Sequence, residues 1–390
     1  MTQTRTRHHL VFIGKLGVHS VREICLGAAE YAAGRSDLDF DPWPLSAGLQ
    51  TGARRENLRE VDCLIAPASD IRSLFGGVRH LKIPYVNVLD HQREAPSVEL
   101  DDTAIGRMAA DHLVSRGYRQ LAFVGSTEWP WSRLRKESFT QAIKPAGIVP
   151  KCYEFATDIL PIEWSWKSER RRRLLAEVLT ALPKPCGVFA ANDVIACFLI
   201  ETARELGIRI PEELGVLGVD DDPVPNAAAG LAISSVVVPF REMGRRAAEL
   251  VDQLRRGKDA RRIQLPPTRV VVRTSTDAFM VEDRLVRHAQ AYIESHRQGR
   301  IKVSEVARAV GCTRVTLGQR FGRHLRVGVL DYILQRRMEY AKDLLRAGEL
   351  NVDQVAQACG FQNSPFFCSV FKRITGTTPG RVRAEAKQSA

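Results

Sequence analysis

The sequence lacks the features that mark membrane, secreted and zinc-binding proteins. Its eight cysteines are scattered and contain no C-x-x-C pair, so they read as reduced thiols of a cytoplasmic protein. The longest apolar runs, such as 236–238 and 270–272, are far too short to cross a bilayer. The first 14 residues carry basic side chains before a short apolar run, but Gly14 and Lys15 interrupt it at once. We therefore expect a first β-strand there and no signal peptide.

The sequence also lacks the common catalytic motifs. No G-x-G-x-x-G follows a strand, and there is no P-loop, no nucleophile elbow and no histidine cluster with metal-ligand spacing. We therefore expect no enzyme activity, no metal and no cofactor.

Acidic residues are scarce in the last 107 residues. This segment has 19 Lys and Arg against 8 Asp and Glu, whereas the rest of the chain has 38 against 37. Nearly all of the net charge of +12 therefore lies in one region. The stretch ACGFQNSPFFCSVFKR (358–373) has no carboxylate at all. This segregation favours a polyanionic partner over a merely solvated basic face.

From residue 8 to 276, apolar strand-like runs alternate with amphipathic helical patterns. The strand candidates are residues 10–14, 62–67, 83–90, 120–125, 186–192 and 214–220. The helical patterns are residues 102–116, 133–146, 167–182, 194–206 and 242–256. Such alternation predicts parallel sheets in an α/β fold, and the length suits two lobes. Ligands of such folds bind at the carboxyl ends of the strands, which here are the loops after Ile13, Pro67, Leu89, Gly125, Ala191 and Val219.

The pattern changes near residue 277. We predict a linker at 277–283 and an all-α domain at 284–390. Residues 303–321 and 352–371 share one layout, in which a short helix precedes a turn glycine and a second helix ends in phenylalanine. The polar cap of the second helix is Thr313 in the first copy and Asn363 or Ser364 in the second. Each copy has the sequence form of a helix-turn-helix.

A helical wheel separates the core from the exposed face of each second helix. Leu317, Phe321, Phe367 and Phe371 point inward. The outward side chains would lie against double-stranded operator DNA, with Gln319 reading a base edge and Lys372 meeting a phosphate. The predicted DNA-binding residues are Arg314, Val315, Thr316, Gln319, Arg320, Ser364, Pro365, Phe366, Ser369 and Lys372.

The two copies are joined by a long amphipathic helix, predicted over residues 330–347. Its inner stripe is expected to contain Leu330, Ile333, Leu334, Ala341, Leu344 and Leu345. A rigid connector of this kind would hold the two second helices in adjacent segments of the major groove.

Residues 285–386 resemble the DNA-binding domain of the AraC/XylS regulators. The resemblance rests on ARAVGCTRVTLGQRFGRHL, on the connector helix and on QACGFQNSPFFCSVFKRITGTTPGRVR. It implies a transcription regulator that binds DNA through two helix-turn-helix units.

The α/β part resembles LacI/GalR-type sensors and periplasmic sugar-binding proteins. The resemblance rests on DDTAIGRMAADHLVSRGYRQLAFVG (101–125), RLRKESF (133–139), VFAANDVIA (188–196) and LGVLGVDDDP (214–223). It implies two lobes that close on a sugar. The resemblance nominates as its ligands Asp101, Arg135, Asn192 and Asp220. Asp70, Asp90 and Asp102 are second-rank candidates, with Asp102 favoured as a helix cap. Trp129 and Trp131 would stack on a sugar face or pack at the rim.

A sensor followed by an AraC-type domain is the order found in regulators of xylose operons, which this chain resembles over nearly its whole length. The resemblance implies a pentose effector, D-xylose, and activation of sugar-utilisation genes with RNA polymerase. We expect a homodimer formed through the sensor lobes, with no membrane association. The alternatives are an α/β enzyme acting on a small polar substrate, with Asp101 and Asp220 as its carboxylate pair, and a transport binding protein.

Overall fold

The computed structural model describes residues 7–45, 60–76, 83–91, 95–160, 168–259, 261–277, 283–325, 327–348 and 350–389. It divides into two compact units. The α/β unit comprises residues 1–112 and 120–276, and the helical unit comprises residues 113–119 and 277–390. Most of the predicted linker, residues 278–282, lies outside the described residues. Among those described, no helix combines the length and hydrophobicity needed to cross a membrane.

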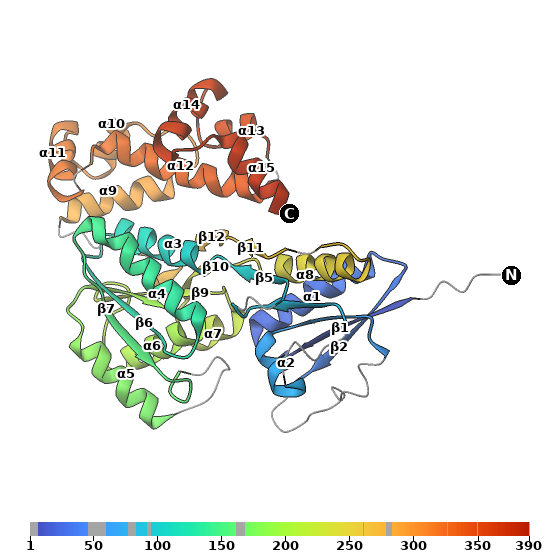
Figure 1. Ribbon diagram of the computed structural model, residues 1–390. Coiled ribbons are helices and arrows are strands. Elements are labelled where there is room, and N and C mark those ends of the chain that lie inside the picture. The colour runs from blue at the N-terminus through green and yellow to red at the C-terminus, as the bar shows by residue number, and fades with distance from the viewer. Residues whose placement is uncertain are drawn as a thin grey trace. The chain divides into compact units, whose positions relative to one another are not determined.

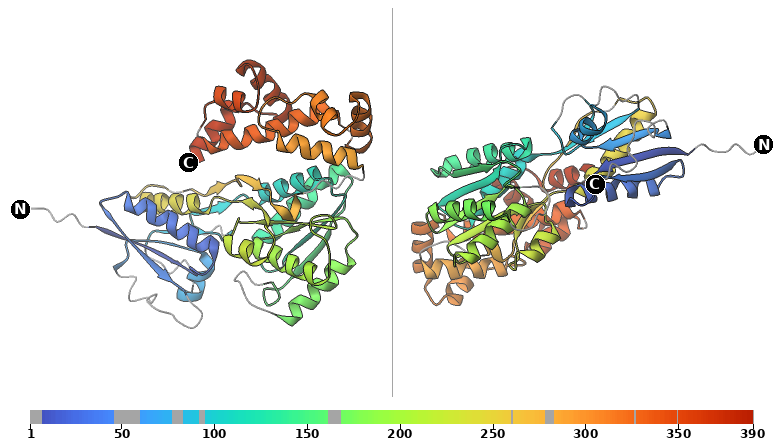
Figure 2. Two further views of the ribbon diagram at one scale, coloured as in Figure 1. Left: turned by 180° about the vertical axis from the view of Figure 1, so that it is seen from behind. Right: turned by 90° about the horizontal axis from the view of Figure 1, so that it is seen from below.

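The α/β unit contains two six-stranded sheets. Each lobe is built around one of them (Figures 1 and 2). The first lobe has the order β11 (Ile263–Leu265), β5 (Ser97–Leu100), β4 (Tyr85–Val88), β3 (Cys63–Ala66), β1 (His8–Gly14) and β2 (Leu38–Pro44). The second lobe has the order β12 (Arg269–Val271), β10 (Ser234–Val237), β9 (Leu214–Val219), β8 (Cys186–Ala190), β6 (Gln120–Ser126) and β7 (Lys151–Phe155). The strands pair in parallel except for β10 with β12. Parallel sheets covered on both faces require apolar strands, and β3, β8 and β9 are buried along their whole lengths.

The helices of the α/β unit lie between the strands, as the sequence pattern predicts. They are α1 (His19–Ala33), α2 (Ala68–Phe75), α3 (Asp102–Ser115), α4 (Pro130–Ile143), α5 (Glu169–Ala181), α6 (Asp193–Glu205), α7 (Pro223–Ala228) and α8 (Phe240–Arg255). Short 3₁₀ turns occupy Lys144–Ala146 and Thr274–Thr276. The chain passes from one lobe to the other three times, before α3, before α8 and between β11 and β12. Three crossings at one edge form the hinge of a two-lobed fold.

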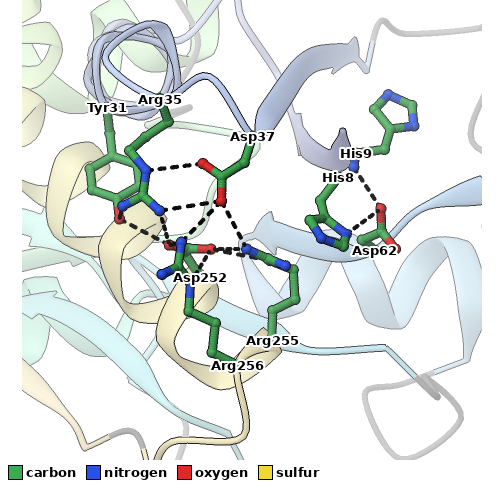
Figure 3. Close-up of polar contacts among 9 residues, drawn as sticks. All are labelled: His8, His9, Tyr31, Arg35, Asp37, Asp62, Asp252, Arg255 and Arg256. Atoms are coloured by element: carbon green, nitrogen blue, oxygen red, sulfur yellow. Dashed lines mark hydrogen bonds and ion pairs between the residues drawn. The ribbon is translucent and has the colours of Figure 1, made fainter. Parts of the chain in front are cut away.

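Helix α8 returns to the first lobe and packs beside α1, as the two views of Figure 2 show. The close approach requires glycine, because a Cβ on Gly244 would lie 1.9 Å from the carbonyl oxygen of Ile24. An ionic cluster holds the far ends of these helices together (Figure 3). The buried carboxylate of Asp252 on α8 meets Arg255 at 2.6 Å, Arg256 at 3.1 Å and Arg35, which follows α1, at 3.4 Å. This pairing satisfies a charge that would otherwise be costly to bury.

The helical unit has two hydrophobic cores that share one long helix. Its helices are α9 (Arg284–Ser295), α10 (Val303–Ala309), α11 (Arg314–Leu325), α12 (Val329–Ala347), α13 (Val352–Ala358), α14 (Ser364–Thr375) and α15 (Pro379–Ser389). The first core joins α9, α10, α11 and the start of α12, and the second joins the rest of α12 to α13, α14 and α15. Each half is one helix-turn-helix unit. In the second, Asn363 and not Ser364 caps α14, since its Oδ1 accepts the N–H of Phe366 at 2.9 Å.

One expectation for the connector helix is wrong. Leu330 was placed on the inner stripe of α12, but its side chain is 56% exposed. The helix begins one residue earlier than the pattern predicts, and its first residue, Val329, packs in the first core in place of Leu330. Ile333, Ala341 and Leu345 of the same stripe are fully buried as expected.

Candidate ligand cavity and nucleic-acid interface

A cavity of about 500 Å³ lies between the two lobes of the α/β unit, at the carboxyl ends of the strands. All six loops that were expected to surround a ligand contribute to its wall. Its polar and charged lining consists of Lys15, Ser20, Ser69, Asp70, Asp90, Asp102, Arg135, Thr157, Asn192 and Asp220. Its apolar lining includes Val18, Val21, Leu89, Trp129, Trp131 and Phe240. An apolar cleft with a few convergent polar groups is the usual form of a small-molecule site.

Arg135 on α4 is fixed within the second lobe. Its Nε donates to Asp102 Oδ1 at 2.7 Å and its Nη1 donates to the carbonyl of Ala191 at 2.6 Å. The guanidinium carbon lies 4.8 Å from the ring centre of Trp131. Arginine offers five N–H donors in a planar fork, so the two bonds leave further donors for a ligand. The side chain is held in place before any ligand arrives, which reduces the entropy cost of binding.

Asp220 lies in a loop with unusual backbone geometry. Its φ is +106° and that of Asp221 is +56°, and only glycine adopts such values readily. The loop is anchored by the buried carboxylate of Asp193, which accepts the N–H of Asp222 and the hydroxyl of Ser235, each at 2.8 Å. Burial, reinforced by the charge of Asp220, raises the pKa of Asp193 well above its ordinary value. Asp193 therefore positions the loop that carries Asp220 to the cavity.

Burial also raises the pKa of Asp220, to about 7. Arg135 opposes this shift, while the nearby carboxylates of Asp222 and Asp102 add to it. A carboxyl group with this pKa changes its charge near neutral pH. It can accept hydrogen bonds as an anion or donate one as an acid, depending on pH.

The expectation that Asp102 caps α3 is wrong. Asp101 caps α3, since its Oδ1 accepts the N–H of Ala104 at 2.9 Å, and it is absent from the cavity lining. Asp102 lines the cavity and bridges the lobes, because it accepts from Arg135 at 2.7 Å and also lies 2.7 Å from Nε2 of His91. Asp101 therefore supplies the helix cap that was expected of Asp102.

His91 follows β4 in the first lobe and was not singled out from the sequence. Its Nδ1 lies 2.7 Å from Glu99 Oε2, on the other side of the ring from Asp102. Burial alone would lower the pKa of His91, but the hydrogen bonds to Asp102 and Glu99 raise it to about 9. A cationic His91 therefore ties the first lobe to Asp102 at neutral pH. No motif in the sequence signals this role.

Asn192 and the two tryptophans complete the second lobe's side of the cavity. Asn192 Oδ1 caps α6 by accepting the N–H of Ile195 at 2.9 Å, which leaves its amide NH₂ as the group for a ligand. The rings of Trp129 and Trp131 stack with their centres 6.4 Å apart. The indole N–H of Trp129 is buried and has no hydrogen-bond partner among the described residues. Buried donors are normally satisfied, so this N–H is an exception among the described residues.

Several lining residues were not named individually from the sequence. Lys15 lies just after β1 and Ser69 lies in the first turn of α2, beside loops that were expected to surround a ligand, but no motif distinguished them. Thr157 and Phe240 come from segments after β7 and at the start of α8, which the strand pattern did not reveal. Asp70 and Asp90, both second-rank candidates, line the cavity.

The ten predicted DNA-binding residues all lie on α11 and α14, and none is buried. Val315 is 68% exposed and Phe366 is 60% exposed, which is unusual for side chains of this size and hydrophobicity. Their neighbours Leu317 and Phe367 are fully buried. Each helix therefore presents a mixed apolar and polar face outward and holds an apolar face in its own core.

Two of these ten residues already have acidic partners. Arg320 donates to Asp283 at 2.8 Å, and the hydroxyl of Ser364 donates to Asp353. Arg320 would have to exchange this partner for a phosphate on DNA. Gln319, Lys372 and Ser369 are exposed on the same faces. In the described parts of the chain, no three His, Cys, Asp or Glu residues form a metal-binding group.

Two family models match the chain. Residues 110–276 match a periplasmic binding protein-like domain, and residues 306–385 match a helix-turn-helix domain. The first covers part of the α/β unit, and the second covers both helix-turn-helix units of the helical unit.

Similar proteins share both parts in the same order. The xylose operon regulatory protein of Escherichia coli (strain K12) is 29% identical over an alignment of 394 positions. The alignment covers 97% of each chain. The protein of the same name from Haemophilus influenzae is 29% identical over 84% of this chain and 86% of its own. A solved structure described as the xylose-binding transcription activator xylR is 26% identical, covers 97% of this chain and 98% of its own, and has a TM-score of 0.60.

The α/β unit also shares its fold with a LacI family regulator from Enterococcus faecium with bound ribose, at 21% identity and a TM-score of 0.56. That likeness covers 68% of this chain and 98% of the other.

Proposed function

We propose that the chain is a sugar-responsive DNA-binding regulator whose effector is D-xylose, and that the sugar activates transcription. The observation that carries the proposal is the interlobe cavity, in which fixed charged groups face a stacked tryptophan pair. A pentose presents hydroxyl groups around a compact ring and carries no charge. Such a ligand needs donors and acceptors on all sides and a flat apolar surface.

The residues proposed to bind the sugar are Asp102, Arg135, Asn192 and Asp220. Arg135 and Asn192 supply donors, and Asp102 and Asp220 supply acceptors. Asp101, which the sequence resemblance nominated, acts in this proposal through the N-terminus of α3, which it caps. Charge-assisted hydrogen bonds to hydroxyls contribute about 1.5–3 kcal/mol each, so a few of them set the affinity.

Both lobes line the cavity, so a bound sugar would favour the closed arrangement of the lobes. In this proposal closure shifts an existing equilibrium towards a form of the protein that binds its operator. The helices α11 and α14 would read adjacent segments of the major groove through Arg314, Val315, Thr316, Gln319, Arg320, Ser364, Pro365, Phe366, Ser369 and Lys372.

The remaining parts of the proposal come from the resemblance of the sequence. The protein would act in the cytoplasm as a homodimer joined through the sensor lobes, and would recruit RNA polymerase at a promoter. The functional domains would be residues 8–276 for sensing and 284–390 for DNA binding, with 277–283 as the linker. Because the similar proteins are transcription regulators, we expect no catalytic activity.

Isothermal titration calorimetry of the full chain tests the effector. We expect D-xylose to bind more tightly than L-arabinose, D-ribose and D-glucose, and we expect no heat from adenosine. The Arg135→Ala variant should lose about 100-fold or more in xylose affinity, because it removes charged donors to the sugar and one of the two partners of Asp102. The matched control is Asp39→Asn, which changes an exposed carboxylate on β2 outside the cavity. Preferential binding of a purine, or unchanged affinity in Arg135→Ala, would refute this site.

A further inference from the structure

The helical unit is held together by more than its two hydrophobic cores. The first core ends at Ile333 of α12 and the second begins at Met338, so only this helix continues from one core into the other among the described residues. A single shared helix sets the distance between the two helix-turn-helix units. With no further contacts, the angle between these two units could still change. Additional contacts between the halves would restrict that angle.

Two adjacent arginines on α12 supply such contacts, one to each half of the helical unit. Consecutive helical residues point about 100° apart, so neighbours can reach different partners. Arg336 donates to Glu294 of α9 in the first half at 2.8 Å. Arg337 donates through Nε to the carbonyl of Cys359 in the second half at 2.6 Å and lies over the ring of Phe361 at 4.3 Å. Arg337 is only 6% exposed, although it is charged and lies mid-helix.

A backbone contact reinforces the arginines. The loop after α9 lies directly on the turn of the second helix-turn-helix, where the N–H of Gly299 donates to the carbonyl of Ala358 at 3.2 Å. A Cβ on Gly360 in that turn would lie 2.2 Å from the carbonyl carbon of Gly299. This contact therefore exists only because residue 360 has no side chain.

The equivalent glycine of the first unit shows that this contact is specific. Gly311 and Gly360 occupy the same place in the repeated layout, with φ of +71° and +70°. A Cβ on Gly311 would meet nothing within 4 Å, whereas one on Gly360 would collide with the first half of the domain. Both turns need a residue that tolerates positive φ, but only the second also needs empty space.

We propose that Arg336, Arg337, Gly299 and Gly360 form a clasp that locks the two helix-turn-helix units into one rigid reader of DNA. The inference rests on the proposed DNA-binding function. Because of the clasp, the protein would recognise the spacing between two major-groove segments as well as their sequences. One added base pair turns the second segment by about 35° and moves it by about 3.4 Å, and a locked reader cannot follow that change.

The test measures spacing tolerance with the full chain. Wild-type protein first selects a duplex from a random-sequence pool in the presence of D-xylose, and hydroxyl-radical footprinting locates the two segments that one chain protects. Affinities are then measured for this duplex and for duplexes with one base pair inserted or deleted between the segments. We expect wild type to lose about 100-fold on either change, as when several base contacts are lost together.

Asparagine variants distinguish the loss of the clasp from a change in the turn backbone. Asparagine tolerates a left-handed backbone, so Gly311→Asn should keep the wild-type spacing penalty. Gly360→Asn should weaken binding to the selected duplex and reduce the spacing penalty to less than about 10-fold. Arg337→Lys, which keeps the charge but loses the paired donation to Cys359, should reduce the penalty as well.

Three outcomes would overturn the clasp. The first is an equal spacing penalty in all four proteins. The second is a Gly360→Asn chain that no longer protects one segment while Arg337→Lys keeps the full penalty, since the defect would then be local unfolding of the second unit. The third is a wild-type protein that selects its duplex with no spacing penalty. A wild-type protein that selects no duplex refutes the DNA-binding function itself and the clasp with it.

Discussion

The Asp220→Asn substitution gives the sharpest test of the cavity chemistry. Asn replaces a carboxylate with an uncharged group of the same shape, and it tolerates the positive φ of +106° at this position better than most residues. If Asp220 accepts a sugar hydroxyl as an anion, the variant loses one charge-assisted hydrogen bond. That loss corresponds to about 1.5–3 kcal/mol, or roughly 10- to 150-fold in affinity.

The pH dependence of wild type follows from the same group. Burial raises the pKa of Asp220 to about 7, so the group is mostly protonated at pH 6 and mostly ionised at pH 8. The ionised fraction changes about tenfold between these values, and affinity for a neutral sugar should rise by about the same factor as pH increases. His91, with a pKa raised to about 9, stays largely cationic across this window.

Calorimetry at pH 6, 7 and 8 measures both effects. Asp220→Asn should bind xylose weakly and with no pH dependence, whereas His19→Gln, a change near Asp222 but outside the cavity lining, should keep the slope of wild type. The reasoning is refuted if wild type binds equally at all three pH values or if Asp220→Asn retains the slope.

The remaining predictions concern DNA. Gln319→Ala should relax base preference at one position of the operator by about 1–3 kcal/mol while leaving the salt dependence unchanged, as measured by binding to a panel of single-base variants. Lys372→Ala should weaken binding to all sequences and lower the slope of log affinity against log salt by about 1, as measured by titration at several salt concentrations. Identical effects of the two substitutions would contradict their assignment to base and phosphate.

The fold could be predicted well because its signals are local and repeated. Buried strands such as 186–190 and 214–219 are continuous apolar runs, and the helices between them have clear periodicity. Strand β5 was missed because it is short and contains Glu99, a buried carboxylate whose charge is balanced by His91 and Arg262. The partners of Glu99 come from other parts of the chain, so no local pattern indicates that Glu99 is buried.

The sequence pointed to the loops of the cavity and to Arg135, Asn192 and Asp220 in its lining, but it could not distinguish Asp101 from Asp102. Asp101 and Asp102 are identical side chains in consecutive positions, and the direction in which the chain leaves β5 decides which one caps α3 and which one faces the cavity. The roles of His91 and Arg337 could not be predicted from the sequence for a similar reason. Both are charged groups held by distant partners, and a hydrophobicity pattern assigns such side chains to the surface.

The affinity of the full chain for its selected duplex, with and without D-xylose, tests most directly whether the sugar controls DNA binding. We predict that saturating xylose raises the affinity of wild type by about 5- to 150-fold, the usual range of allosteric coupling, and that Arg135→Ala binds the duplex without responding to sugar. Equal affinity of wild type in the presence and absence of xylose, or an undiminished response in Arg135→Ala, would contradict the account.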